Sequence, residues 1–392
     1  MSETNTLTSS VMPTYSRFPI SITKGEGSYV WDDAGKQYLD YTAGIATCNL
    51  GHAPETVKEA VKDQLDTLWH CSNLYHIPIQ EQLAELLTVH TFADKVFFGN
   101  SGAEANEAAI KLARSYAQKV KGTTAFEVVT FSQSFHGRTL ATLAATGQEK
   151  IQKHFAPLAK GFRYLPYNDI AALDQLIGPD TCGVLVELVQ GEGGVIPADA
   201  AWIKEVERLC KEHDVLFMLD EVQTGVGRTG TLYAYEQYDV EPDVLTTAKG
   251  LASGIPIGAM LAGSKAAAAF EAGSHGSTFG GNPVAAAAGK ATLEVITNPS
   301  FLIEVQESAD YFRAELEKIA AESGAFTDVR GKGLLLGLGT TGKAIALVHE
   351  ARELGLLVLV AGEHVLRILP PLNTNKAEID FCIETLKQIA GA

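Results

Sequence analysis

Apolar runs alternate with segments of helical spacing through the middle of the chain, between residues 53 and 265. The runs rich in Val, Ile, Leu and Phe predict strands at 96–98, 126–131, 183–188, 215–219, 244–248 and 257–262. Apolar residues at helical spacing predict helices at 103–119 and 200–212. Such alternation is typical of an α/β protein with a mostly parallel sheet between two layers of helices.

The two ends of the chain have a different pattern. Residues 1–52 contain short strand-like runs with a turn at Asp33, Ala34 and Gly35, and residues 285–392 contain long helices around short strands. We therefore expect a large domain at 53–284. A smaller α+β domain would be built from both ends together, 1–52 and 285–392.

Composition and charge exclude several classes of function. The net charge is −16 over 392 residues and is not gathered in one tail, which disfavours nucleic acid as a partner. The five cysteines are scattered and show no CxxC spacing, so neither a disulfide framework nor a metal site is expected. The sequence shows no secretory leader and no apolar stretch of about 18 residues. We expect a cytoplasmic protein without a membrane partner.

Polar residues follow three of the predicted strands. Ser101 and Gly102 lie between a strand and a helix, where backbone N–H groups bind anions, although the motif taken alone favours an ordinary turn with Ser101 as helix cap. Asp220 ends a second strand and Lys249 ends a third. The carboxyl ends of parallel strands share one edge of a sheet, so these groups are expected to meet there.

This combination suits one cofactor, pyridoxal phosphate. It needs a phosphate site, a carboxylate for its ring nitrogen and a lysine for its Schiff base. Burial would lower the pKa of the lysine and free its amine. In FSQSFHGRT at 131–139, Phe135 could stack on the ring and Arg138 could bind a substrate carboxylate, unless they are simply a core and a surface residue.

Two other classes of protein share parts of this pattern. A dinucleotide-dependent oxidoreductase requires a G-x-G-x-x-G turn directly after a strand; the glycines at 225–230 have that spacing but follow a polar loop. A non-catalytic binding protein that keeps the fold would be marked by loss of the lysine or the aspartate. Both Lys249 and Asp220 are present.

Eight segments in order resemble the class III, ornithine-type aminotransferases among the fold type I pyridoxal-phosphate enzymes. They are TYSRFPI at 14–20, NSGAEANEAAIKLAR at 100–114, FHGRT at 135–139, VELVQGEGGVIP at 185–197, LDEVQTGVGRTG at 219–230, AKGLASGIPIGA at 248–259, HGSTFGGNP at 275–283 and LRILPPL at 366–372. The resemblance extends over nearly the whole chain and implies that fold.

The resemblance also implies roles at the cofactor. Lys249 would form the Schiff base and move the proton, and Asp220 would pair with the ring nitrogen, so these two are the expected catalytic residues. The other cofactor contacts would be Ser101, Gly102 and Ala103 at the phosphate, Phe135 on the ring, Gln223 near the ring hydroxyl, and Thr278 at the phosphate of the neighbouring subunit. The last contact implies a homodimer with shared active sites.

Substrate contacts follow from the same resemblance. Arg138 would bind the α-carboxylate of an acylated diamino acid, Arg367 would bind that of glutamate or 2-oxoglutarate, and Glu192 would pair with Arg367 when it is free. Tyr15 and Ser277 are expected to contribute to the substrate site, and Glu187 to support the cofactor from deeper in its strand.

The expected reaction transfers the terminal amino group of N-acetylornithine to 2-oxoglutarate, which belongs to arginine synthesis. Donors used by sister families are the alternatives: ornithine, succinylornithine, succinyldiaminopimelate, 4-aminobutyrate or N-acetyllysine. The cofactor motifs do not distinguish among them.

Overall fold

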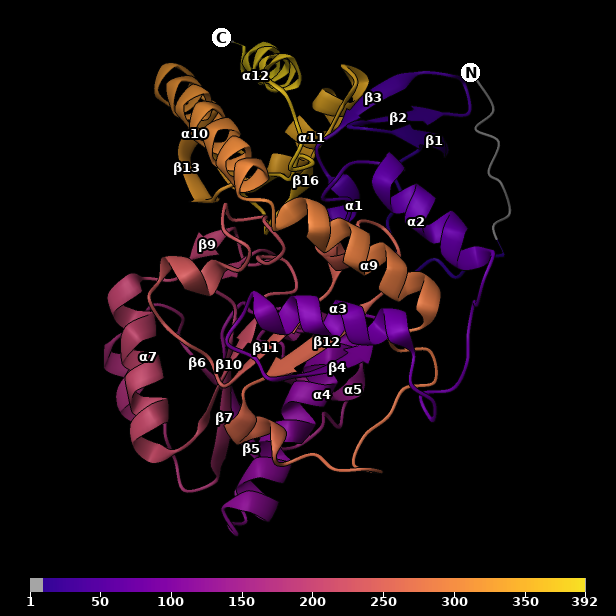
Figure 1. Cartoon of the computed structure of the whole chain (residues 1–392). Coiled ribbons are helices and arrows are strands. Elements are labelled where there is room, and N and C mark those ends of the chain that lie inside the picture. Colours follow the sequence, from indigo (N-terminus) through magenta and orange to yellow (C-terminus); the bar gives the residue numbers. More distant parts are fainter. Residues whose placement is uncertain (1–9, 392) are drawn as a thin grey trace.

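The computed structural model describes residues 10–391, and a seven-stranded sheet forms its centre (Figure 1). In sheet order the strands are β4 (Lys95–Gly99), β12 (Gly258–Ala262), β11 (Val244–Thr247), β10 (Leu216–Asp220), β7 (Thr181–Val186), β5 (Glu127–Phe131) and β6 (Phe162–Leu165). All are parallel except β12, which runs antiparallel to both neighbours. The mostly parallel sheet predicted from the sequence is confirmed. Strand β6 was not predicted.

Helices cover both faces of this sheet. On one face α4 (Gly102–Ser115) packs over Met218 of β10, and on the other α7 (Ala200–His213) buries Trp202 against Phe217. Alternate residues of each strand therefore meet different helices, which explains why the strands are apolar throughout. The helix predicted at 103–119 ends earlier, because a π-helical turn occupies Tyr116–Val120.

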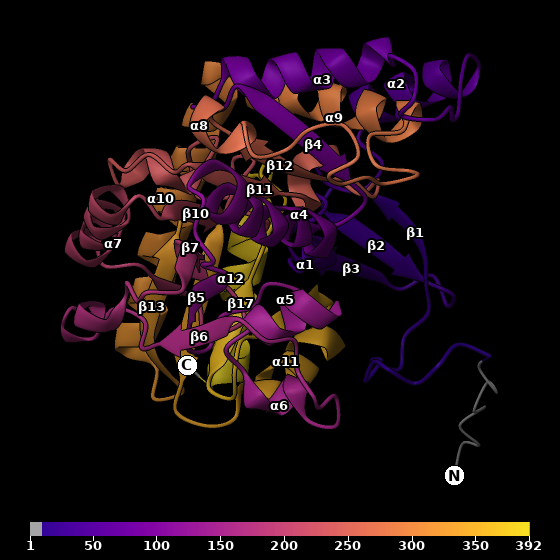
Figure 2. The same cartoon turned by 90° about the horizontal axis from the view of Figure 1, so that it is seen from below.

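Three helices from distant parts of the sequence form a second layer beside β4. They are α2 (Glu55–Leu65), α3 (Pro78–Val89) and α9 (Pro283–Ile296), and their apolar faces join one large core with both ends of the chain. Figure 2 shows α3 and α9 side by side over the β4 edge. Three short helices, α5 (Leu140–Ala145), α6 (Glu149–Gln152) and α8 (Ser264–Ala267), lie in the connections of the central sheet.

The N-terminal and C-terminal segments pair with each other. A four-stranded sheet has the order β1 (Ile22–Glu26), β2 (Tyr29–Asp32), β3 (Gln37–Asp40) and β15 (Leu356–Leu357), with β15 parallel to β3. The turn expected at 33–35 lies between β2 and β3. Side chains reinforce the pairing: the Ser28 hydroxyl donates to Glu378 Oε2 at 2.9 Å. Figure 1 shows these indigo and yellow elements together above the central sheet.

The remaining C-terminal strands form a second small sheet, in the order β13 (Phe326–Lys332), β14 (Leu335–Thr340), β17 (Val365–Ile368) and β16 (Leu359–Val360). It is accompanied by α10 (Pro299–Glu322), α11 (Ala344–Glu353) and α12 (Lys376–Ala390). A two-stranded ribbon, β8 (Val189–Gln190) and β9 (Ile196–Pro197), lies along the chain between β7 and β10 of the central sheet. The domain boundaries at 53 and 284 stay a prediction, and residues 1–9 and 392 lie outside the described part. Over 10–391, no helix has the length and apolar character needed to span a membrane.

Candidate active site

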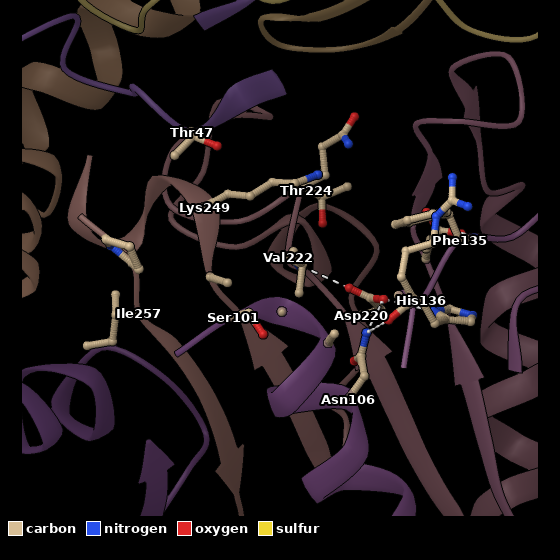
Figure 3. A pocket seen from close by; sticks show the side chains of 18 of the residues that line it. Thr47, Ser101, Asn106, Phe135, His136, Asp220, Val222, Thr224, Lys249 and Ile257 are labelled. Atoms are coloured by element: carbon tan, nitrogen blue, oxygen red, sulfur yellow. Dashed lines mark hydrogen bonds and ion pairs between the residues drawn. The ribbon is translucent and has the colours of Figure 1, made fainter. Parts of the chain in front are cut away.

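A cavity of about 390 Å³ opens at the carboxyl ends of β4, β10 and β11. Ser101, Asp220 and Lys249 all line it, so the structure brings together the three groups that sequence analysis placed on one sheet edge (Figure 3). Gly102, Ala103, Phe135, Arg138, Glu187, Glu192 and Gln223 also line it. The arrangement combines an amine, a carboxylate and a helix N-terminus around one space.

The N-terminus of α4 forms one wall of the cavity. Ser101 caps the helix, with its hydroxyl oxygen accepting the N–H of Glu104 at 3.2 Å. Two glycines let this turn pack closely: a Cβ on Gly258 would lie 2.2 Å from the Ser101 carbonyl oxygen, and one on Gly102 would lie 2.6 Å from Val222. The free N–H groups and the helix dipole favour an anion here.

Asp220 is held by two donors that sequence analysis did not identify. Its Oδ2 lies 2.7 Å from His136 Nδ1 and accepts the Asn106 amide at 2.8 Å (Figure 3). Among residues 10–391, Oδ1 accepts only the N–H of Val222, at 3.1 Å. Asp220 is 4% exposed, and Asn106 is fixed by the Thr246 hydroxyl at 2.6 Å. One carboxylate oxygen is thus saturated, and the other can accept a further donor.

The sequence contains features that indicate both donors, Asn106 and His136. Asn106 is polar at a position that the helical spacing assigns to the buried face of α4, and His136 stands between Phe135 and Arg138 in FHGRT. A buried amide or imidazole needs a polar partner, and Asp220 was the one predicted to lie nearby. The geometry of the turn before α5 was required to bring His136 to it.

A second buried carboxyl lies next to Asp220. Burial, reinforced by the negative charge of Asp220, raises the pKa of Glu187 well above its usual value. The Glu187 Oε2 accepts the N–H of Phe135 at 2.9 Å. Glu187 therefore favours its neutral form and orients the segment that carries Phe135.

Lys249 lies at the start of a 3₁₀ turn directly after β11. Its φ of 41° is in the left-handed region, which is unusual for a residue with a side chain and directs Lys249 toward the cavity. Burial lowers the pKa of its amine from 10.5 to about 8. Near neutral pH about a tenth of this amine is therefore neutral and nucleophilic, which is far more than for a lysine with an ordinary pKa.

Arg367 reaches the site from β17 through an ion pair. Its Nη1 bonds Glu192 Oε1 at 2.6 Å, the Gly191 carbonyl oxygen at 3.1 Å and Gln223 Oε1 at 3.3 Å, and the residue is 2% exposed. Burial favours the neutral acid, but the charge and hydrogen bond of Arg367 outweigh it and lower the pKa of Glu192. Glu192 lines the cavity and Arg367 stands behind it.

A second arginine lies at the open side of the cavity. Arg138 is exposed, and its guanidinium carbon lies 5.7 Å from the centre of the half-buried Phe135 ring. This geometry fits a cation–π contact. The two arginines therefore approach the same cavity from different elements.

Besides Arg367, which stands behind Glu192, three residues expected at the site do not line this cavity. Tyr15 is 75% exposed and does not contribute to the lining. Ser277 and Thr278 line a neighbouring surface groove of about 790 Å³, and Asn100 Nδ2 donates to Ser277 Oγ at 3.2 Å, which links the groove to the turn before α4. In the part of the chain that the structure describes, no group of His, Cys, Asp and Glu residues has the geometry of a metal site.

Comparison with known proteins identifies the family. Residues 11–390 match the class III aminotransferase family. The acetylornithine aminotransferase of Oceanobacillus iheyensis is 55% identical over 390 residues, which cover 100% of this chain and 98% of that protein. The N-acetylornithine aminotransferase structure from Stenotrophomonas maltophilia has 38% identity and a TM-score of 0.84, covering 95% of each chain.

A third relative adds information on the cofactor. The ornithine aminotransferase of Toxoplasma gondii has 30% identity and a TM-score of 0.93, covers 97% of this chain and 91% of its own, and is described with pyridoxal phosphate at its active site. These likenesses agree with the lysine, carboxylate and helix N-terminus found around one cavity. The chain belongs to the class III aminotransferases, enzymes that transfer amino groups with pyridoxal phosphate.

Proposed function

We propose that this protein transfers the terminal amino group of N-acetylornithine to 2-oxoglutarate, giving N-acetylglutamate 5-semialdehyde and glutamate, a step of arginine synthesis. The observation that carries the proposal is the ion pair between Glu192 and Arg367 at the wall of the cavity that holds Lys249. Such a pair can open to bind the α-carboxylate of a dicarboxylate and close for a donor that has no carboxylate next to its reacting amine. The acetylornithine aminotransferase of O. iheyensis, at 55% identity, supports the choice of donor.

The cavity residues fit pyridoxal phosphate. Ser101, Gly102 and Ala103 offer N–H groups and a hydroxyl to the phosphate, Phe135 a ring surface, and Gln223 an amide near the ring hydroxyl. The Oδ1 of Asp220 can accept the N–H of the ring nitrogen, because Oδ2 already has His136 and Asn106. When bound, the cofactor withdraws electrons from the donor carbon that bears the amine and so makes its proton acidic.

Lys249 is the proposed base in this reaction. Its lowered pKa leaves Nζ able to accept the proton from the donor carbon and later to return it, so a single amine moves the proton in both half-reactions. Asp220 would accept the N–H of the ring nitrogen and stabilise positive charge there. Glu187 is a neutral neighbour that limits repulsion near Asp220.

Two arginines would distinguish the two substrates. Arg138, at the open side, would bind the α-carboxylate of the acylated donor, and Arg367 would bind the α-carboxylate of 2-oxoglutarate after displacing Glu192. While the donor is bound, Glu192 neutralises Arg367. Tyr15 and Ser277 belong to this proposal through the family resemblance alone.

A homodimer in the cytoplasm completes the proposal. Thr278 is exposed beside the groove at 70–80 and 272–280, where a partner subunit would receive it at its own phosphate site. Leu74 and Phe279 are 89% and 59% exposed around it, and a second copy would bury them.

The proposed location in the cytoplasm agrees with the cysteines. They are free, which suits a reducing compartment.

The test is a comparison of amine donors with the purified holoenzyme. N-acetylornithine, ornithine, N-succinylornithine and 4-aminobutyrate are added separately without a keto acid, and the visible spectrum reports conversion of the cofactor to its aminated form. Rapid conversion with N-acetylornithine, reversed by 2-oxoglutarate and absent in Lys249→Ala, is expected. A faster reaction with ornithine or 4-aminobutyrate would leave the aminotransferase chemistry in place and refute the donor.

A further inference from the structure

Arg228 is a buried cation to which the proposed reaction gives no role. It lies within the glycine motif at 225–230 and is 0% exposed. Over residues 10–391, its side-chain hydrogen bonds go to two carbonyl oxygens and an amide oxygen rather than to a carboxylate. Burial lowers its pKa to about 9, so it is charged at neutral pH. A buried charge without a counter-ion is costly unless polar groups satisfy its donors. The positions of those groups indicate what the arginine does.

The guanidinium of Arg228 binds the ends of two neighbouring strands. Its Nη1 donates to the Leu334 carbonyl oxygen at 3.1 Å and to that of Pro370 at 2.5 Å. Leu334 directly precedes β14 and Pro370 follows β17, and these strands pair with each other. The Leu334 N–H returns a bond to the Arg228 carbonyl oxygen at 3.0 Å, so the loop and the sheet are joined in both directions.

Asn49 connects this arginine to the Lys249 turn. Its Oδ1 accepts Arg228 Nη2 at 2.8 Å, and its Nδ2 donates to the Val226 carbonyl oxygen at 2.7 Å. A Cβ on Gly250 would lie 2.1 Å from Asn49 Nδ2, so the amide packs directly on the residue that follows Lys249. Arg228 and Asn49 together form a buried hub between the cofactor side and the β14–β17 sheet.

The two strands that the hub holds also carry Arg367. This arginine lies in β17, opposite Gly337 of β14. Gln223, in the same loop as Arg228, also contacts Arg367 Nη1. We propose that Arg228, held by Asn49, is a positioning residue that sets the distance from Arg367 to Lys249 and so determines how well a dicarboxylate binds. The inference rests on the proposed function, since it assigns Arg367 to 2-oxoglutarate.

The test separates binding of the dicarboxylate from chemistry at Lys249. Holoenzyme variants Arg228→Lys and Asn49→Ala are compared with Arg330→Lys, a control in β13 of the same small sheet whose arginine pairs with Asp328. Two quantities are measured: the rate of the donor half-reaction, and the dissociation constant of glutarate, a dicarboxylate without a reactive carbonyl. Lysine retains the charge of Arg228 but loses its planar fork of donors.

We expect Arg228→Lys to weaken glutarate binding and raise the KM for 2-oxoglutarate by about tenfold or more, because displacements of about 1 Å are costly in such sites. The donor half-reaction should change by less than about threefold. Asn49→Ala should weaken glutarate binding in the same direction by less, again with a nearly unchanged donor half-reaction, and Arg330→Lys should change neither.

Equal losses in both half-reactions, or a lower melting temperature with unchanged glutarate binding, would reduce Arg228 to a purely structural residue. If Arg228→Lys does not fold, the same two measurements on Asn49→Ala test the positioning role. Failure of the proposed function would appear differently, as a wild-type enzyme that does not convert N-acetylornithine or is not reversed by 2-oxoglutarate.

Discussion

At the scale of single residues, the chemistry depends on how burial changes ordinary side chains. Lys249 and Glu187 have pKa values moved in opposite directions, downward for the amine and upward for the carboxyl, and in both cases burial is the largest cause. Burial disfavours whichever form is charged. The cavity therefore increases the neutral fraction of the amine and of the acid, while Asp220 is held by His136 and Asn106.

The lowered pKa of Lys249 predicts how the apoenzyme takes up its cofactor. Only the neutral amine attacks an aldehyde, so the rate of covalent uptake of pyridoxal phosphate should rise with pH and level off above about 8. A lysine with an ordinary pKa of about 10.4 would give a rate that still rises at pH 10. Borohydride trapping followed by peptide mass spectrometry measures this rate at Lys249. Lys249→Ala is the control without uptake.

Glu192 predicts an asymmetric effect on the two half-reactions. Glu192→Ala leaves Arg367 as an unpaired cation, since the ion pair at 2.6 Å is lost, so the donor half-reaction should slow by about tenfold. The dicarboxylate half-reaction should be unchanged or faster, because 2-oxoglutarate no longer competes with a carboxylate. Single-turnover kinetics measure each half-reaction, and Glu192→Gln, which retains a hydrogen-bonding side chain, should be intermediate. Equal effects on both half-reactions would contradict the proposal that Glu192 neutralises Arg367 while the donor is bound.

Sequence analysis predicted those groups of the site that follow strands. Ser101, Asp220 and Lys249 came from the pattern alone, because the ends of parallel strands meet at one edge. His136 and Asn106 did not, since their contacts to Asp220 join segments whose approach only the folded chain defines. The roles assigned to Tyr15, Ser277 and Thr278 depended on family resemblance and stay predictions.

At the scale of elements, the turn before α4 shows how packing defines a binding site. Strand β12 begins with Gly258 directly against Ser101, and its antiparallel direction was not predicted, because an apolar run carries no information about its orientation. Strand β6 was missed because it is only four residues long and contains Arg163 and Tyr164. Short strands at a sheet edge have weak sequence patterns.

Two glycines at the ends of β12 provide a matched pair of variants. A Cβ on Gly258 would lie 2.2 Å from the Ser101 carbonyl oxygen, whereas a Cβ on Gly263 would meet nothing closer than Phe92 at 3.8 Å. Gly258→Ala should therefore displace the phosphate turn and weaken pyridoxal phosphate binding by about tenfold or more, while Gly263→Ala should leave it unchanged. Equilibrium dialysis of the cofactor measures both. Similar affinities in the two variants would show that the turn tolerates the displacement.

At the scale of the whole molecule, the proposed dimer depends on an exposed apolar surface. Leu74 and Phe279 flank the groove that Thr278 lines, and the centres of the His70 and Phe279 rings lie 5.2 Å apart. Solvent-exposed apolar side chains gathered at one groove indicate a protein interface. The groove is thus the expected place where one subunit would complete the site of another.

Charge introduced at this groove should separate the subunits. Leu74→Asp and Phe279→Asp are each expected to weaken dimerisation by about tenfold or more, since a buried interface disfavours an unpaired carboxylate. Analytical ultracentrifugation over a range of concentrations measures the change. Phe155→Asp, at a side chain that is 56% exposed and does not line the groove, should sediment as the wild type does. Monomeric wild-type protein would refute the shared site.

The pairing of β15 with β3 has a consequence for synthesis on the ribosome. Strands β1 to β3 emerge first, yet the strand that completes their sheet, Leu356–Leu357, is among the last segments to be translated. At roughly 5–20 residues per second, these strands wait on the order of tens of seconds with one edge unpaired. Nascent chains stalled before residue 356 should therefore leave residues 22–40 open to protease or to a chaperone, whereas the central sheet, complete by residue 262, should already be protected.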